Sequence, residues 1–156
     1  MNKIAKWAGI IMLTALLLLA VTLESLQMMA TSSGVRAIEI PENSQISKFT
    51  QGSDYLDAYA IQISSQMNID NVMDQQSMLH GSVVLEAENE IILKGNAPGL
   101  HYYASYFINS SSDDSALVLS TVVVYENHIG RLYFSIIKPF HRHLVPFALS
   151  KLIGNQ

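Results

Sequence analysis

Three histidines lie near the C-terminal end of the chain, and histidine is the commonest metal ligand in proteins. His141 and His143 are two residues apart, so on a continuous α-helix their side chains point about 200° apart. These two histidines cannot share one ion unless the helix breaks, although a site made of His128, His141 and His143 is the sharpest reading of the three. The spacing therefore argues against a metal site, and we expect no metal and no cofactor.

Other catalytic patterns are missing from the sequence. There is no cysteine, which excludes disulfides and thiol nucleophiles. The nucleophile-elbow pattern of serine hydrolases is absent, and so is a glycine-rich loop that would cradle a phosphate. No acid–base pair can be identified from the residues. We therefore name no catalytic residue, and an enzyme is the weakest of our three functional hypotheses.

The charge changes sign along the chain. The formal net charge is −4, which gives no reason to expect a nucleic-acid partner. No acidic residue follows Glu126, whereas four basic residues do. This basic end could meet an acidic ligand group or anionic headgroups, or it could simply neutralise the acidic remainder of the chain. This basic end is expected to form a helix, and we assign to the polar face of that helix His128, Arg131, Lys138, His141 and Arg142.

The first thirty residues have the layout of an export signal. Lys3 and Lys6 precede the uncharged run from Trp7 to Leu23, as a basic n-region precedes an apolar h-region. This run is at the lower limit of length for a helix that crosses the hydrocarbon core. We predict a signal anchor over residues 1–30, a single-pass transmembrane helix with the C-terminal domain on the extracytoplasmic side of the cell membrane. A cleaved signal peptide, and so a secreted protein, is the alternative.

Residues 31–53 are expected to form a linker or extended arm, and residues 54–156 one domain. Short connections between consecutive strands predict an antiparallel sheet of about five strands. Pro98 and Gly99 suit a type II turn, in which the glycine adopts a positive φ. A short helix is expected from Ser65 or Asn68 to about Leu79. The expected strands are Asp54–Ile63, Ser82–Ala87, Glu90–Lys94, Leu100–Asn109 and Ser115–Glu126.

A long helix is expected after the last strand. Asn127 can cap a helix that begins near Ile129, and apolar residues then recur at steps of three and four. Pro139 and Pro146 should each bend this helix, because each removes a backbone hydrogen bond and crowds the carbonyl four residues back. A helix bent in this way can curve around a sheet. The expected fold is α+β, an antiparallel sheet against a long C-terminal helix.

The run from Thr121 to His143 resembles the closing strand and helix of a mainly bacterial family, domain of unknown function 2867. The resemblance extends loosely over residues 54–153 and implies a helix-grip fold like that of START and Bet v 1-like proteins. The family has no established reaction, so it implies no catalytic residue. The segment before Gly81 is short for the family. The matching residues are Thr121, Val122, Val123, His128, Gly130, Arg131, Leu132, Tyr133, Lys138, Pro139, Phe140, His141 and Arg142.

Aromatic and apolar side chains could line a cavity between the sheet and the helix, although such residues more often fill a core. The first hypothesis is a membrane-anchored, non-enzymatic domain that binds a small apolar or amphiphilic ligand, for example a lipid. The second is a structural or protein-interaction module of the cell envelope without a ligand cavity. The candidate ligand-binding residues are Tyr55, Tyr59, Tyr102, Tyr106, Tyr133, Ile136 and Phe140.

Overall fold

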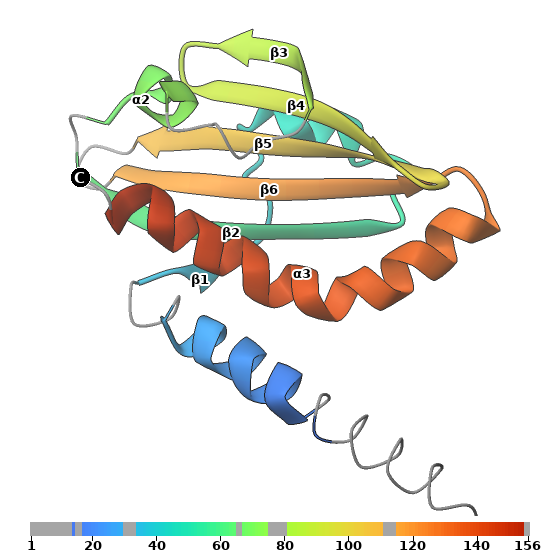
Figure 1. Ribbon diagram of the computed structural model, residues 1–156. Helices are drawn as coiled ribbons and strands as arrows, with labels where there is room; N and C mark the ends of the chain where they lie inside the picture. Colours follow the sequence, from blue (N-terminus) through green and yellow to red (C-terminus); the bar gives the residue numbers. More distant parts are fainter. Residues whose placement is uncertain are drawn as a thin grey trace, which may run out of the picture.

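The computed structural model describes residues 14, 17–29, 34–64, 67–74, 81–110 and 115–154. These residues form a six-stranded antiparallel sheet, with a long C-terminal helix across one face (Figure 1). The strand order is β1-β2-β6-β5-β4-β3. The strands are β1 (Arg36–Ala37), β2 (Tyr55–Ile63), β3 (Ser82–Ala87), β4 (Glu90–Ala97), β5 (Leu100–Ser110) and β6 (Ser115–Tyr125). The helices after β1 are the 3-10 helix η1 (Gln45–Phe49), α2 (Ile69–Asp74) and α3 (His128–Gly154).

The predicted antiparallel sheet and long C-terminal helix are both present, and the number of strands is six rather than five. The additional strand is β1, which pairs two residues of the expected arm with Ala60 and Tyr59 of β2. The predicted helix before Gly81 corresponds to α2, and residues 65–66 and 75–80 lie outside the described residues. The strands were predictable because alternation and turn chemistry are local signals.

The predicted N-terminal transmembrane helix is wrong, and so is the single-pass membrane placement that depended on it. No helix among the described residues is both long enough and apolar enough to cross a membrane. The helical run over residues 17–29 contains Glu24 and, at about 1.5 Å per residue, measures about 20 Å against a hydrocarbon core of about 30 Å. Residues 1–13, with the basic start and much of the predicted h-region, lie outside the described residues.

The two faces of the sheet are covered by different parts of the chain. Because side chains alternate along a strand, each strand contributes to both faces. The face away from α3 is covered by residues 38–49, and η1 lies behind the sheet in Figure 1. The buried Glu90 carboxylate holds η1 there by accepting hydrogen bonds from the Ser44 and Ser105 hydroxyls and from the N–H groups of Gln45 and Ile46.

The start of α3 is fixed against the turn between β4 and β5. Gly99 has a φ of 73°, as the predicted type II turn requires, and its carbonyl oxygen accepts hydrogen bonds from the N–H groups of Glu126 and Asn127. Asn127 caps α3 as predicted, since its Oδ1 accepts from the N–H groups of Ile129 (2.9 Å) and Gly130 (3.2 Å). Gly130 packs so closely on Gly99 that a Cβ atom there would overlap the Gly99 carbonyl.

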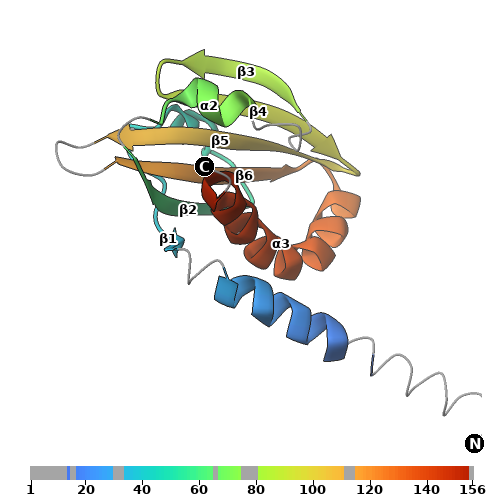
Figure 2. The ribbon, with the colours of Figure 1, turned by 60° about the vertical axis from the view of Figure 1, so that its left-hand side comes forward.

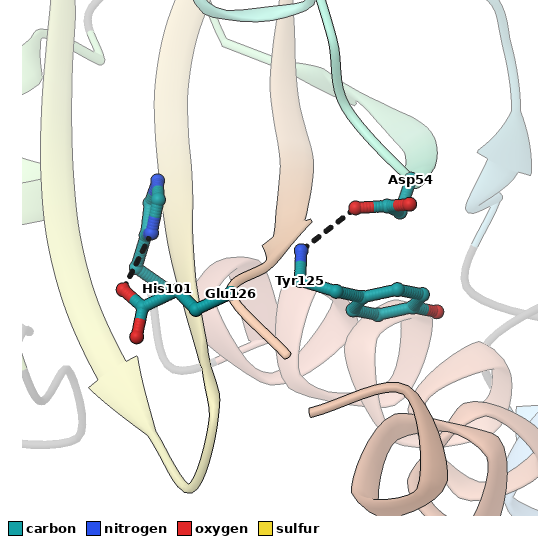
Figure 3. Close-up of polar contacts among 4 residues, drawn as sticks. All are labelled: Asp54, His101, Tyr125 and Glu126. Atoms are coloured by element: carbon teal, nitrogen blue, oxygen red, sulfur yellow. Dashed lines mark hydrogen bonds and ion pairs between the residues drawn. The ribbon is translucent and has the colours of Figure 1, made fainter. Parts of the chain in front are cut away.

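Polar contacts hold the neighbouring strand ends together beside this turn (Figure 3). Asp54, just before β2, accepts a hydrogen bond of 2.7 Å from the backbone N–H of Tyr125 at the end of β6. His101 Nδ1 on β5 lies 3.0 Å from the Glu126 carboxylate that precedes α3. The end of the sheet from which α3 departs is therefore tied across three strands.

The helix α3 contacts the sheet near both of its ends. Phe134 packs in one apolar cluster with Tyr55, Leu100 and Val123, and Leu149 packs in another with the far end of the same face. Both ribbon views show that α3 is bent, with its concave side toward the sheet (Figures 1 and 2). Pro139 and Pro146 both lie inside the helix, where the sequence predicted bending.

Replacing Gly130 with alanine should destabilise the protein by about 2 kcal/mol, because the new Cβ overlaps backbone atoms of Gly99 that cannot rotate away. Helix propensity alone predicts the opposite sign, a gain of up to about 1 kcal/mol. Urea unfolding of Gly130→Ala checks the sign, with Ser135→Ala on the exposed side of α3 as the control. A stabilised Gly130→Ala would contradict the close contact.

Candidate functional site

A cavity of about 370 Å³ lies between α3 and the sheet. Its volume falls within the range of about 300–1,000 Å³ that is typical of small-molecule sites. Its walls are mainly apolar, with hydroxyl groups and one imidazole among them. The lining residues are Ala97, Leu100, Tyr102, Ala104, Tyr106, Leu119, Thr121, Val123, Tyr133, Phe134, Ile137, His141, Leu144, Val145 and Ala148.

The cavity exists because the middle row of the sheet face carries small side chains. Ala104 on β5 lies directly opposite Thr121 on β6, and Thr121 lies opposite Asp57 on β2. The rows on either side carry tyrosines, Tyr102 in one and Tyr106 in the other. The short middle row under a bent helix leaves a space, open on one side, that the larger neighbouring rows border.

Two tyrosines, Tyr102 and Tyr106, and the glycine opposite Tyr102 shape one wall of the cavity. Tyr102 lies opposite Gly95 on β4, and a Cβ atom at Gly95 would overlap the Tyr102 ring. The missing side chain therefore lets the ring lie across the strand. Tyr106 is buried, and this burial raises the pKa of its hydroxyl well above the ordinary value, with a further contribution from Tyr102.

A polar cluster of Tyr55, Asp57 and His141 adjoins the apolar space. The Tyr55 hydroxyl donates a hydrogen bond of 2.7 Å to Asp57 Oδ2, and His141 Nδ1 lies 3.2 Å from the same oxygen. The imidazole is within ion-pair distance but is not aligned for a hydrogen bond. Among the described residues, Asp57 Oδ1 and His141 Nδ1 are both buried without a hydrogen-bond partner.

The surroundings of this cluster favour a neutral Tyr55. Burial is the largest cause of a raised pKa at Tyr55, and the hydrogen bond to Asp57 and its negative charge raise the pKa further. A hydrogen bond with Arg142 acts in the opposite direction. Lys138 places its ammonium 5.1 Å from the centre of the Tyr55 ring, a cation–π contact.

Three of the seven predicted ligand-binding residues line the cavity, namely Tyr102, Tyr106 and Tyr133. Tyr55 and Tyr59 lie on the same sheet face but belong to the neighbouring polar and core clusters. Phe140 is half-buried outside the lining, and Ile136 is 62% exposed on the outer side of α3.

The residues of the predicted polar face of α3 do not all face solvent in the structure. His128, Arg131 and Arg142 are exposed, whereas Lys138 covers Tyr55 and His141 lies between the helix and the sheet. The sequence carried a signal for the partner of His141, because Asp57 stands between Tyr55 and Tyr59 on the apolar side of an alternating strand. Within the described part of the chain, no three histidine, aspartate or glutamate side chains are grouped to hold a metal ion.

Two other hollows lie outside this space. One of about 440 Å³ lies beside residues 38–50 and includes Glu39 and Glu42, and one of about 390 Å³ lies beside Arg142 and His143. Both are similar in volume to the cavity under α3, but charged side chains line them. The apolar walls make the space under α3 the better candidate for a small-molecule site.

Residues 82–148 match the family described as Protein of unknown function (DUF2867). This match confirms the predicted resemblance to that family over β3 to β6 and most of α3. All the residues that line the cavity fall inside it, whereas Tyr55 and Asp57 lie outside. A search of curated proteins finds no match. The likeness to START and Bet v 1-like proteins stays a prediction.

Removing the Tyr106 hydroxyl should make the protein less sensitive to alkaline pH. Tyrosine has a pKa of about 10 in an unfolded chain, and the pKa in the folded protein is higher. The unfolded state therefore loses its proton first, so the wild type loses stability as the pH rises above about 10. Urea unfolding at pH 8 to 11 should show a smaller loss for Tyr106→Phe. If the free energy of unfolding falls equally with pH in the wild type and in Tyr106→Phe, the raised pKa of Tyr106 is contradicted.

Proposed function

We propose that the domain binds a small apolar or amphiphilic ligand in the cavity between the sheet and α3, and that it does so without catalysing a reaction. The observation that carries this proposal is the apolar space of about 370 Å³. The family match supports an uncharacterised domain and adds no activity.

The size and the walls of the cavity suit a compact organic molecule. An apolar protein cavity of about 150 Å³ is large enough to bind benzene, so this space has room for a fused two-ring compound or a short acyl chain. Transfer of such a molecule from water onto aliphatic and aromatic side chains is favourable by the hydrophobic effect. The hydroxyl groups and the imidazole on the walls allow an amphiphilic ligand as well.

The alternative of a structural or interaction module assumed a domain without a cavity. The space under α3 counts against that form of the hypothesis. Ala104 and Thr121 are not covered by the bulky side chains that would close the core between the two contact clusters of α3. A domain selected only for rigidity would gain dispersion contacts by filling this space.

A cavity-filling substitution tests the proposal directly. Naphthalene is the probe, and it is titrated into full-length protein after bound lipid has been removed. The wild type should bind about one equivalent, and Ala104→Phe should bind at least about tenfold more weakly because the new ring occupies the space. The control is Val84→Phe on the exposed edge strand β3, which should bind like the wild type.

Native mass spectrometry of the untreated protein supplies a second readout, since a carrier should retain small molecules from its host. Circular dichroism establishes that each variant is folded. The proposal fails if the wild type binds no naphthalene and retains no small molecule. It fails equally if folded Ala104→Phe binds naphthalene as tightly as the wild type does.

A further inference from the structure

Two polar atoms beside the apolar cavity have no hydrogen-bond partner among the described residues. They are Asp57 Oδ1 and His141 Nδ1, and the side chains that carry them are largely buried. Buried polar groups in proteins are nearly always paired with protein or with bound molecules. His141 lines the cavity whereas Asp57 does not, so the imidazole is the group of this pair that a ligand can reach.

Tyr55, Asp57 and His141 lie at different distances from the cavity, so we infer different roles for them. His141 is the only one of the three that lines the cavity. Asp57 lies behind it on β2, in the same cross-strand row as Thr121, and its Oδ2 is 3.2 Å from His141 Nδ1. Tyr55 donates to the same Oδ2, which fixes the carboxylate in front of the imidazole. The ring is also held edge-on to Tyr55 and to Phe134.

The Asp57 carboxylate determines whether the His141 imidazole offers a donor or an acceptor to a ligand. A carboxylate beside Nδ1 favours the tautomer that carries its proton on Nδ1, and Nε2 is then an acceptor. A ligand hydroxyl can donate to Nε2. A ligand carboxylate cannot donate, and it would bring a second negative charge close to Asp57.

We propose that His141, positioned by Asp57 and Tyr55, is the recognition site for a hydroxyl group, so that the ligand is an apolar alcohol or phenol rather than a hydrocarbon or a fatty acid. The inference rests on the proposed ligand-binding function and narrows its ligand class. Lys138 and Arg142 are the basic groups on the same helix near this site, and Lys138 is already in contact with the Tyr55 ring.

Three probes that share one ring system separate the possibilities, namely naphthalene, 2-naphthol and 2-naphthoate. The wild type should bind 2-naphthol about tenfold more tightly than naphthalene, the scale of one net hydrogen bond, and 2-naphthoate more weakly than 2-naphthol. His141→Phe should abolish the preference for 2-naphthol over naphthalene, which is read as the ratio of the two affinities within the variant. Asp57→Asn keeps the size of the side chain and should reduce the preference for 2-naphthol over naphthalene. This variant provides the test if His141→Phe does not fold.

The matched control is His128→Phe, which changes an exposed histidine of the same helix and should keep the wild-type preference. The inference is overturned if folded His141→Phe and Asp57→Asn both retain the preference, if the wild type shows none, or if 2-naphthoate binds most tightly. Each of these results leaves naphthalene binding, and so the proposed function, intact. A wild type that binds none of the three probes and retains no small molecule overturns the proposed function and this inference together.

Discussion

The close contact between Gly99 and Gly130 is the constraint on which the arrangement of this domain depends. A turn that needs a positive φ at Gly99 turns its carbonyl oxygen toward the end of β6, where it accepts the N–H groups of Glu126 and Asn127. Gly130 then packs directly on this turn, since any side chain would overlap it. The first turn of α3 is thereby fixed at one end of the sheet, and the path of the whole helix follows from it.

The cavity results from a helix that is held at both ends and bent between them. Phe134 and Leu149 belong to separate apolar clusters on the same sheet face, and His141 lies between them in sequence. Beneath this middle part, the sheet presents Ala104 and Thr121 where its neighbouring rows present tyrosines. The space therefore results from side-chain size and helix curvature. Its walls carry the His141 imidazole as well as tyrosine and threonine hydroxyl groups, and Tyr55 and Asp57 lie beside it.

Local signals in the sequence predicted much of this fold and little of the site. The strands, the Gly99 turn and the Asn127 cap were predictable because each depends on a few adjacent residues. The orientation of His141 was not, because Ile136 and other apolar residues also occur on the outer side of a bent helix. Its contact with Asp57 joins β2 to α3, and the only sequence signal for it is that Asp57 lies on the apolar side of an alternating strand. The N-terminal prediction is wrong because the described helical run over residues 17–29 is too short and contains Glu24.

The central claim is that the space between α3 and the sheet can hold an apolar guest. Crystals of the full-length protein under xenon pressure test it most directly, because apolar cavities bind xenon. We predict xenon, or a small molecule retained from the host, bounded by Ala104, Thr121 and Val145. Crystals in which side chains of α3 pack directly onto Ala104 and Thr121, with no bound atom between them, would contradict it.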